Sequence, residues 1–150
     1  MIRKWIVSLM VLALFMIPAA ASAAPAPALT NLQYTGITSD GNNFIWENIS
    51  PNQTVANVTL TGTKGYISVY AQGTMQAPNY PVLRQNGSMI PTTQSAPNQF
   101  ITGPGNIVVG TVYYRSFDLN DVHTGNISVT ANNYLPPYRT FTDTLYITVQ

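Results

Sequence analysis

Alternation of apolar and polar residues predicts β-strands along much of the chain. In the segment 55–61, Val58 and Leu60 share one side of an extended backbone, and polar residues occupy the other side. The segments 125–131 and 141–149 alternate in the same way. This two-residue period is typical of an antiparallel sheet with one face on the core and the other in water. We therefore expect each of these strands to bury a single face.

Turn-forming residues separate the apolar runs at the spacing expected of a β-sandwich. The expected strands are 30–37, 43–48, 55–61, 65–71, 81–84, 106–115, 125–131 and 141–149. No window of helical length keeps the apolar period of a helix without interruption by Gly, Pro or β-branched residues. The sequence thus predicts an all-β fold, an immunoglobulin-like antiparallel β-sandwich of about 7–8 strands. The stretch 85–105 fits no such pattern and is expected to be a long loop.

The segment 1–23 has the features of a cleaved secretory signal. Two basic residues lead into the apolar run 5–17, which is shorter than the about 20 residues that a bilayer-spanning helix needs. Small residues at 21–23 then form an A-x-A cleavage site before Ala24. We therefore expect a secreted, extracellular protein that has no membrane anchor after cleavage.

Composition narrows the range of partners. Charged residues make up 7% of the chain, against about a quarter in ordinary proteins. Once the signal is removed, four basic residues stand against five acidic ones. Without a basic patch, binding to nucleic acid or to anionic lipid is not expected. A surface with so little charge repulsion favours association, and the absence of cysteine excludes disulfides.

The start of the secreted chain is expected to be extended. Pro25 and Pro27 remove backbone donors and bias the residues before them away from helical geometry. We therefore assign residues 24–35 to an extended N-terminal arm and residues 36–150 to one β-sandwich domain. A chain of this length is long enough to bury one core.

Motifs that carry catalysis are missing from the sequence, so we expect a protein that is not an enzyme. Thiol catalysis needs a cysteine, and a Ser-His-Asp site would have to use the one histidine, His123. No Gly-x-Ser-x-Gly turn presents a serine. No phosphate-binding loop, metal-hydrolase helix or dinucleotide-binding fingerprint occurs either.

The polar loop before the strand at 125–131 carries oxygen ligands of the type that Ca²⁺ prefers. Asp118, Asn120 and Asp121 supply them within four residues. The same residue types also form turns in which a side chain accepts hydrogen bonds from the nearby backbone. The sequence leaves both interpretations open, and it indicates no cofactor other than Ca²⁺.

Sequons for N-glycosylation are frequent in this chain. They begin at Asn48, Asn52, Asn57, Asn86 and Asn126. Asn57 and Asn126 fall on the sides of their strands that the alternation assigns to solvent. Glycans at these two positions are therefore sterically feasible.

The C-terminal segment carries a family resemblance. Residues 140–149 read Thr-Phe-Thr-Asp-Thr-Leu-Tyr-Ile-Thr-Val. This segment resembles the terminal signature of spore coat protein U domains and related chaperone–usher pilins. In that family an incomplete immunoglobulin-like sandwich is completed in the fibre by the N-terminal arm of the next subunit, and a secretion chaperone reads the last strand.

The resemblance implies a homopolymer joined head to tail by strand donation. Leu145, Ile147 and Val149 would line the acceptor groove, and Leu32 and Tyr34 in the arm would be the donor-strand anchors. The partners would be further copies of the chain and a secretion chaperone. An extended segment pairs with an open sheet edge through its main-chain hydrogen bonds. In the competing arrangement, the arm pairs within its own domain and the protein stays monomeric.

The sequence therefore favours a non-enzymatic extracellular structural protein, a self-assembling pilus or filament subunit. The alternative is a carbohydrate-binding or adhesive β-sandwich module at the cell surface, in which aromatic rings form the contact with a glycan. The candidate rings are Trp46, Tyr80, Tyr134 and Tyr138. We expect Trp46 in the core, since most aromatic residues of a small sandwich are buried, and the two tyrosines that flank a Pro-Pro loop near the surface.

Overall fold

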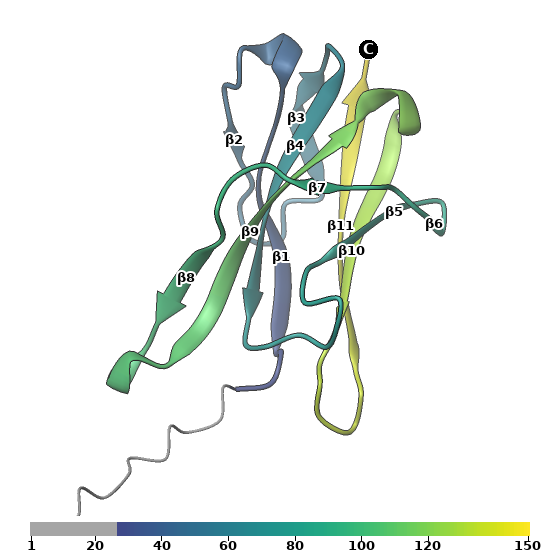
Figure 1. Cartoon of the computed structure of the whole chain (residues 1–150). Helices are drawn as coiled ribbons and strands as arrows, with labels where there is room; N and C mark the ends of the chain where they lie inside the picture. The colour runs from purple at the N-terminus through teal and green to yellow at the C-terminus, as the bar shows by residue number, and fades with distance from the viewer. Residues whose placement is uncertain (1–26) are drawn as a thin grey trace, which may run out of the picture.

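A computed structural model describes residues 27–150, so the expected signal and the first residues of the arm lie outside the described residues. Two β-sheets pack face to face, and short loops join them (Figure 1). The all-β sandwich predicted from the alternation is confirmed. Among residues 27–150, no helix is long and apolar enough to cross a membrane.

The first sheet, called sheet 1 here, has the strand order β2-β1-β4-β9-β7. β8 also pairs with β9, at other positions than β7 does. Neighbouring strands of this sheet are antiparallel. Its strands are β1 (Asn31–Ser39), β2 (Glu47–Asn48), β4 (Lys64–Gln72), β7 (Thr93–Gln94), β8 (Gln99–Thr102) and β9 (Val108–Asp118).

The second sheet, sheet 2, has the order β3-β11-β10-β5-β6. Its strands are β3 (Val55–Leu60), β5 (Val82–Gln85), β6 (Ser88–Met89), β10 (Gly125–Asn132) and β11 (Thr140–Val149). The pair β3 and β11 is parallel, whereas the other pairs are antiparallel. Short 3₁₀ turns lie in three of the connections: η1 (Asp40–Asn42), η2 (Pro104–Asn106) and η3 (Leu119–Asp121).

Two stretches differ from the strands expected from the sequence. The expected strand 43–48 shortens to β2, because Asn43 and Phe44 take left-handed backbone angles with φ of 54° and 57°. The stretch 85–105, expected to be a loop, contains the short strands β6, β7 and β8. These strands pair over two to four positions, which is too short for a periodic pattern to reveal them.

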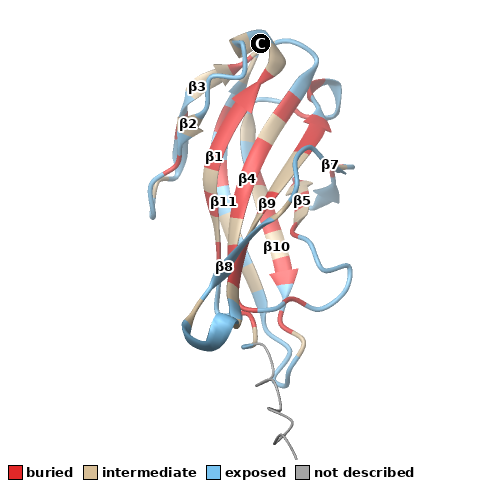
Figure 2. Cartoon of the chain, turned by 60° about the vertical axis from the view of Figure 1, so that its left-hand side comes forward, coloured by how far each residue is buried: buried red, intermediate tan, exposed pale blue. Residues whose placement is uncertain are grey.

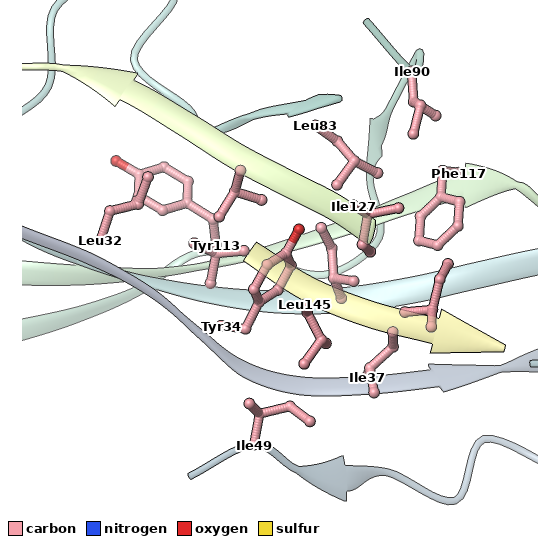
Figure 3. Close-up of a cluster of buried hydrophobic side chains, with 14 of the residues drawn as sticks. Leu32, Tyr34, Ile37, Ile49, Leu83, Ile90, Tyr113, Phe117, Ile127 and Leu145 are labelled. Carbon is pink, nitrogen blue, oxygen red and sulfur yellow. The ribbon is translucent and has the colours of Figure 1, made fainter. Parts of the chain in front are cut away.

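The core lies between the inner faces of the two sheets. Figure 3 shows side chains from both sheets, among them Ile37, Ile127 and Leu145, meeting in this layer. Figure 2 shows that buried residues follow β1, β4 and β9, whereas β8 and the connecting loops are exposed. The inward positions of β4 are Ile67, Val69 and Ala71, all nearly inaccessible to solvent. Burial of such side chains is the main favourable contribution to folding.

The described part of the expected arm, before the expected boundary at residue 36, pairs within the domain in this structure. β1 pairs with β4 from Asn31 to Ser39, and Leu29 donates a backbone hydrogen bond to Thr74. Leu32 and Tyr34, the expected donor-strand anchors, are 5% and 1% exposed within the core of their own chain. The competing arrangement, pairing within the domain, is therefore the one that the structure contains.

The expected acceptor groove is also filled. Leu145 and Ile147 are fully buried, and Val149 is half-buried against the core. β11 lies between β3 and β10 in sheet 2, so strands of the same chain occupy both of its edges. An open groove beside β11 is absent from the described residues, because β3 fills the position next to the last strand.

Candidate functional site

The outer side of sheet 1 carries a group of aromatic rings. Along β4 the residues Tyr66, Ser68 and Tyr70 alternate with the buried apolar ones and therefore face outward. Tyr114 on β9 pairs with Ser68 and lies on the same side. Two further rings come from the loop between η1 and β2. We call this set the aromatic face: Phe44, Trp46, Tyr66, Tyr70 and Tyr114.

The loop before β2 folds back over β1 and places Phe44 and Trp46 on this face. The left-handed angle at Phe44 reverses the chain, and the hydroxyl of Thr38 donates a 2.8 Å hydrogen bond to the carbonyl of Ile45. The Phe44 ring then lies 5.3 Å from the Tyr66 ring, at an interplanar angle of 63°. Edge-to-face contacts of this kind are favourable, and they leave the faces of the edge-on ring free for a ligand.

Trp46 continues the same strip of rings toward β9. Its ring lies 6.4 Å from that of Tyr114, nearly perpendicular at 86°. The side chain rests on Gly36 of β1, where a Cβ atom would approach its Cε3 atom to 3.0 Å. At the other end of the strip, the Tyr70 ring rests on Gly110, where a Cβ atom would approach within 2.6 Å. Two glycines therefore allow these rings to lie directly on the sheet.

The five rings of the aromatic face lie among uncharged hydrogen-bonding groups, and one oppositely charged pair, Lys64 and Asp118, lies on the same side of the sheet at the end next to Tyr66. The outward positions beside the rings hold amide and hydroxyl side chains, such as Gln33 on β1 and Gln99 on β8. The hydroxyl of Tyr114 donates to the Gln99 side-chain oxygen at 3.3 Å. Phe44 is 55% exposed and Trp46 is 40% exposed. These two rings are therefore open to solvent, whereas Tyr66, Tyr70 and Tyr114 are partly covered.

Glu47 fastens the strand that follows the aromatic loop to the other sheet. Its carboxylate accepts backbone hydrogen bonds from Asn57 at 2.8 Å and from Val58 at 2.7 Å, and a side-chain bond from Gln53 at 2.8 Å. Partial burial raises the pKa of Glu47, but these hydrogen bonds lower it by more, so the pKa lies below its ordinary value. The ionised carboxylate thus ties β2 to β3 and fixes the position at which the loop ends.

Asp40 holds the other end of the aromatic loop. It accepts hydrogen bonds from the Thr63 hydroxyl and from the backbone of Thr63, Lys64 and Gly41. The Thr63 hydroxyl, followed by the backbone donors, lowers the pKa of Asp40 to about 2. A charged aspartate therefore anchors the turn at η1, from which the loop crosses β1.

Comparison with known proteins assigns the chain to a family. A search of curated proteins found no match. A family model described as "Domain of unknown function (DUF4879)" matches residues 24–147. The chain belongs to this family. The match spans both sheets of the sandwich, so the DUF4879 domain includes the aromatic face.

The other aromatic residues singled out in the sequence lie elsewhere in the DUF4879 domain. Tyr80 lies under the guanidinium of Arg115, 4.4 Å from the ring centre. Tyr134 and Tyr138 lie in the loop between β10 and β11, and Tyr138 is exposed there, as expected. The expectation that Trp46 is buried in the core is wrong. Sequence reasoning missed Tyr66 and Tyr70, whose alternation with buried residues was the available signal.

The sequence left two interpretations for the loop with Asp118, Asn120 and Asp121, a calcium site and a hydrogen-bonded turn. In the structure this loop forms the turn. Asp118 accepts hydrogen bonds of 2.8 Å from both the backbone and the side-chain nitrogen of Asn120. Asp121 lies in the same turn, η3. Within residues 27–150, no group of three or more His, Cys, Asp or Glu side chains is placed to hold a metal ion. The calcium site stays a prediction.

His123 lies in a hollow of about 350 Å³ that Ser88 and Asp121 also line. In the described part of the chain no hydrogen bond joins these three side chains. The backbone of His123 is instead held by the Gln85 side chain, through bonds of 2.6 and 2.9 Å. The hydrogen-bonded chain that a Ser-His-Asp nucleophile requires is therefore not formed here.

All five sequon asparagines of the DUF4879 domain are on its surface. They are Asn48, Asn52, Asn57, Asn86 and Asn126. The Asn57 side chain donates a 2.8 Å hydrogen bond to Glu47, which a glycan on that nitrogen would compete with. Glycosylation at these positions stays a prediction.

Proposed function

We propose that this protein is a non-enzymatic extracellular binding module whose aromatic face binds neutral glycans. The observation that carries the proposal is the gathering of five aromatic side chains on the outer side of one sheet. Secretion rests on the predicted signal at 1–23. The proposal corresponds to the carbohydrate-binding alternative that the sequence left open.

The chemistry of the face suits sugars. The C–H groups on one face of a sugar ring carry partial positive charge, and they pack against the negative face of an aromatic ring. The amide and hydroxyl side chains between the rings offer hydrogen bonds to sugar hydroxyls. The charges at the end of the strip, Lys64 and Asp118, are opposite in sign and lie on paired positions, so a net attraction to acidic polymers is not expected. A neutral glycan is therefore the ligand class that this face matches.

The length of the strip favours an oligosaccharide over a single sugar. Tyr66 and Tyr70 are four residues apart on one strand, which corresponds to about 13 Å. Phe44 and Trp46 widen the strip toward β2, and Tyr114 widens it toward β9. Several rings in a row bind consecutive sugars of one chain, and the affinity then increases with chain length.

Strand donation is less favoured by the geometry. A donor arm has to be free, yet β1 pairs with β4 from Asn31 to Ser39 and buries Leu32 and Tyr34 in its own core. Removing these side chains from their core would cost about 1.5–3 kcal/mol each in lost burial. The binding module requires no such rearrangement.

Binding to neutral polysaccharides in a sedimentation assay tests the proposal. The Trp46→Ala and Tyr114→Ala variants should each lose at least about tenfold in affinity, which corresponds to about 1.4 kcal/mol. Tyr146→Ala, on the outer side of sheet 2, is the matched control and should bind like the native chain. Native protein that binds none of a broad set of neutral glycans would overturn the proposal, as would equal losses in the control.

A further inference from the structure

The edge strand β8 is exposed along its whole length. All four of its residues are open to solvent, and among the described residues it pairs only with β9. Its other edge therefore presents backbone N–H and C=O groups without a strand partner. Phe100 is 64% exposed and Ile101 is 38% exposed. Natural proteins usually protect such an edge, since it offers a template for another strand.

A charged side chain protects another edge of the sandwich, whereas β8 is short and has a register shift at Ile101 but carries no charge. The carboxylate of Glu47 covers backbone N–H groups of β3, so a charged group occupies that edge. Around β8 the situation is the reverse, because no charged residue occurs between Arg84 and Arg115. Two copies of this segment meet without electrostatic repulsion, whereas a charged partner would gain nothing here.

We propose that β8 is a dimerisation edge, at which β8 of a second copy pairs antiparallel about a two-fold axis perpendicular to the sheet. With such an axis, the residues that lie opposite one another in the two copies point to the same side of the sheet. With Phe100 opposite its own counterpart, Gln99 of each copy lies opposite Ile101 of the other. The strand is therefore complementary to itself, and each apolar residue meets an uncharged neighbour.

Phe100 gains the most from this pairing. It pairs with the buried Thr111 of β9, so its side chain lies on the core-facing side of the sheet, at a hollow of about 310 Å³. Met75, Val108 and Tyr113 also line this hollow. In the dimer, two Phe100 rings meet over adjoining hollows, where their apolar surface leaves water. Aromatic cross-strand pairs stabilise antiparallel sheets.

The geometry of the dimer also bears on ligand binding. A two-fold axis perpendicular to sheet 1 keeps the outer side of the sheet on the same side in both copies. The two aromatic faces would then form one continuous surface, with Ile101 of each copy near its middle. A long glycan could then contact both copies at once, which would raise its overall affinity. This consequence rests on the proposed function, whereas the dimer itself does not.

A charge exchange at Phe100 tests the dimer directly. Sedimentation velocity of the full chain over a range of concentrations should show a monomer–dimer equilibrium. Phe100→Lys and Phe100→Asp should each weaken the dimer at least about tenfold, because like charges then lie opposite one another. An equimolar mixture of the two variants should recover the dimer, since the opposed side chains attract. Circular dichroism of both variants checks that the exposed substitutions leave the fold intact.

Leu135→Lys is the matched control, because it adds the same charge at an exposed apolar residue in the β10–β11 loop. This variant should dimerise like the native chain. Native protein that stays monomeric at its highest soluble concentration would overturn the proposal, and so would a dimer that Phe100→Lys leaves unchanged. Failure of the mixture to recover the dimer would overturn the assigned register. The Trp46→Ala variant should dimerise normally, which separates this result from that of glycan binding.

Discussion

The outer sides of the two sheets differ sharply in composition. Sheet 1 exposes aromatic rings among amides and hydroxyls, whereas sheet 2 exposes mainly hydroxyl and amide side chains. The outward residues of β10 and β11 include Asn126, Ser128, Thr130, Thr142, Thr144 and Thr148. Tyr146 is the aromatic residue among them. Short polar side chains are therefore sufficient to form a stable, solvated sheet face in this fold.

This difference points to the outer side of sheet 1 as the surface on which to look for function. Rings on the outer side of sheet 1 do not fill the core, since inward residues of the same strands already do so. An exposed aromatic cluster marks an interaction site when a neighbouring face manages without one. The two glycines beneath Trp46 and Tyr70 support this interpretation, because a glycine inside a strand costs about 0.5–1 kcal/mol relative to alanine.

The largest expected effect separates inner from outer positions on one strand. Leu145→Ala removes a fully buried side chain of β11 and should lower the free energy of unfolding by about 3 kcal/mol. Tyr146→Ala, the next residue, faces outward and should cost less than about 1 kcal/mol. Urea denaturation of both variants measures the contrast. Equal losses would show that the two sides of β11 are assigned wrongly.

The next largest effect compares glycan binding by the outer side of sheet 1 with that by the outer side of sheet 2. Gly110→Ala places a methyl group within 2.6 Å of the Tyr70 ring and should displace it, so glycan affinity should fall by roughly fivefold while stability falls by about 1–2 kcal/mol. Ser128→Ala on the outer side of sheet 2 adds no clash and should leave binding unchanged. Titration calorimetry with the same oligosaccharide compares the two. Unchanged binding in Gly110→Ala would remove Tyr70 from the site.

Acid should weaken the attachment of the aromatic loop before the rest of the fold. The folded-state pKa values of Glu47 and Asp40 are both depressed, so the stability that they contribute is present above their ordinary values and lost as the pH falls through the folded ones. For Asp40 this loss extends down to about pH 2. Glu47→Gln should lower the melting temperature at pH 7 and flatten its decrease below pH 4.5. Parallel melting curves for the variant and the native chain at all pH values would contradict this.

The smallest expected effect concerns a buried hydroxyl. The Tyr34 hydroxyl is buried without a hydrogen-bond partner among the described residues. Burial, followed by the nearby charge of Asp143, raises the pKa of Tyr34. Tyr34→Phe removes this unsatisfied group and should leave the stability unchanged or raise it by up to about 1 kcal/mol. Thermal unfolding measures the change, and a loss above this amount would reveal a missing partner for the hydroxyl.

The same contrast explains how much of the fold was predictable. β10 and β11 were expected within a residue of their ends, because a polar outer side makes the alternation clear. β1 also has a buried alternation, but its role as a core strand depends on pairing with β4, which no local pattern reveals. The prolines predicted an extended arm and the resemblance implied that it is donated to another subunit, whereas residues 31–35 pair with β4 of their own chain.

The candidate site was harder to predict than the fold. Trp46 reaches the surface because of left-handed angles at Asn43 and Phe44 and because Gly36, ten residues earlier, leaves room for its ring. These are long-range conditions that the composition of the segment does not express. Tyr66 and Tyr70 were accessible to sequence reasoning, since they alternate with buried residues on a strand that was expected.

Fluorescence of Trp46 tests the central claim most directly. The chain has two tryptophans, Trp5 and Trp46, and only Trp46 remains after the predicted cleavage before Ala24. Protein secreted by its host, with its N-terminus read by mass spectrometry, would be titrated with neutral oligosaccharides of increasing length. The account predicts a saturable change in the emission of Trp46 and an affinity that rises with chain length, both absent in Trp46→Phe. Emission that is unchanged at every length would contradict it.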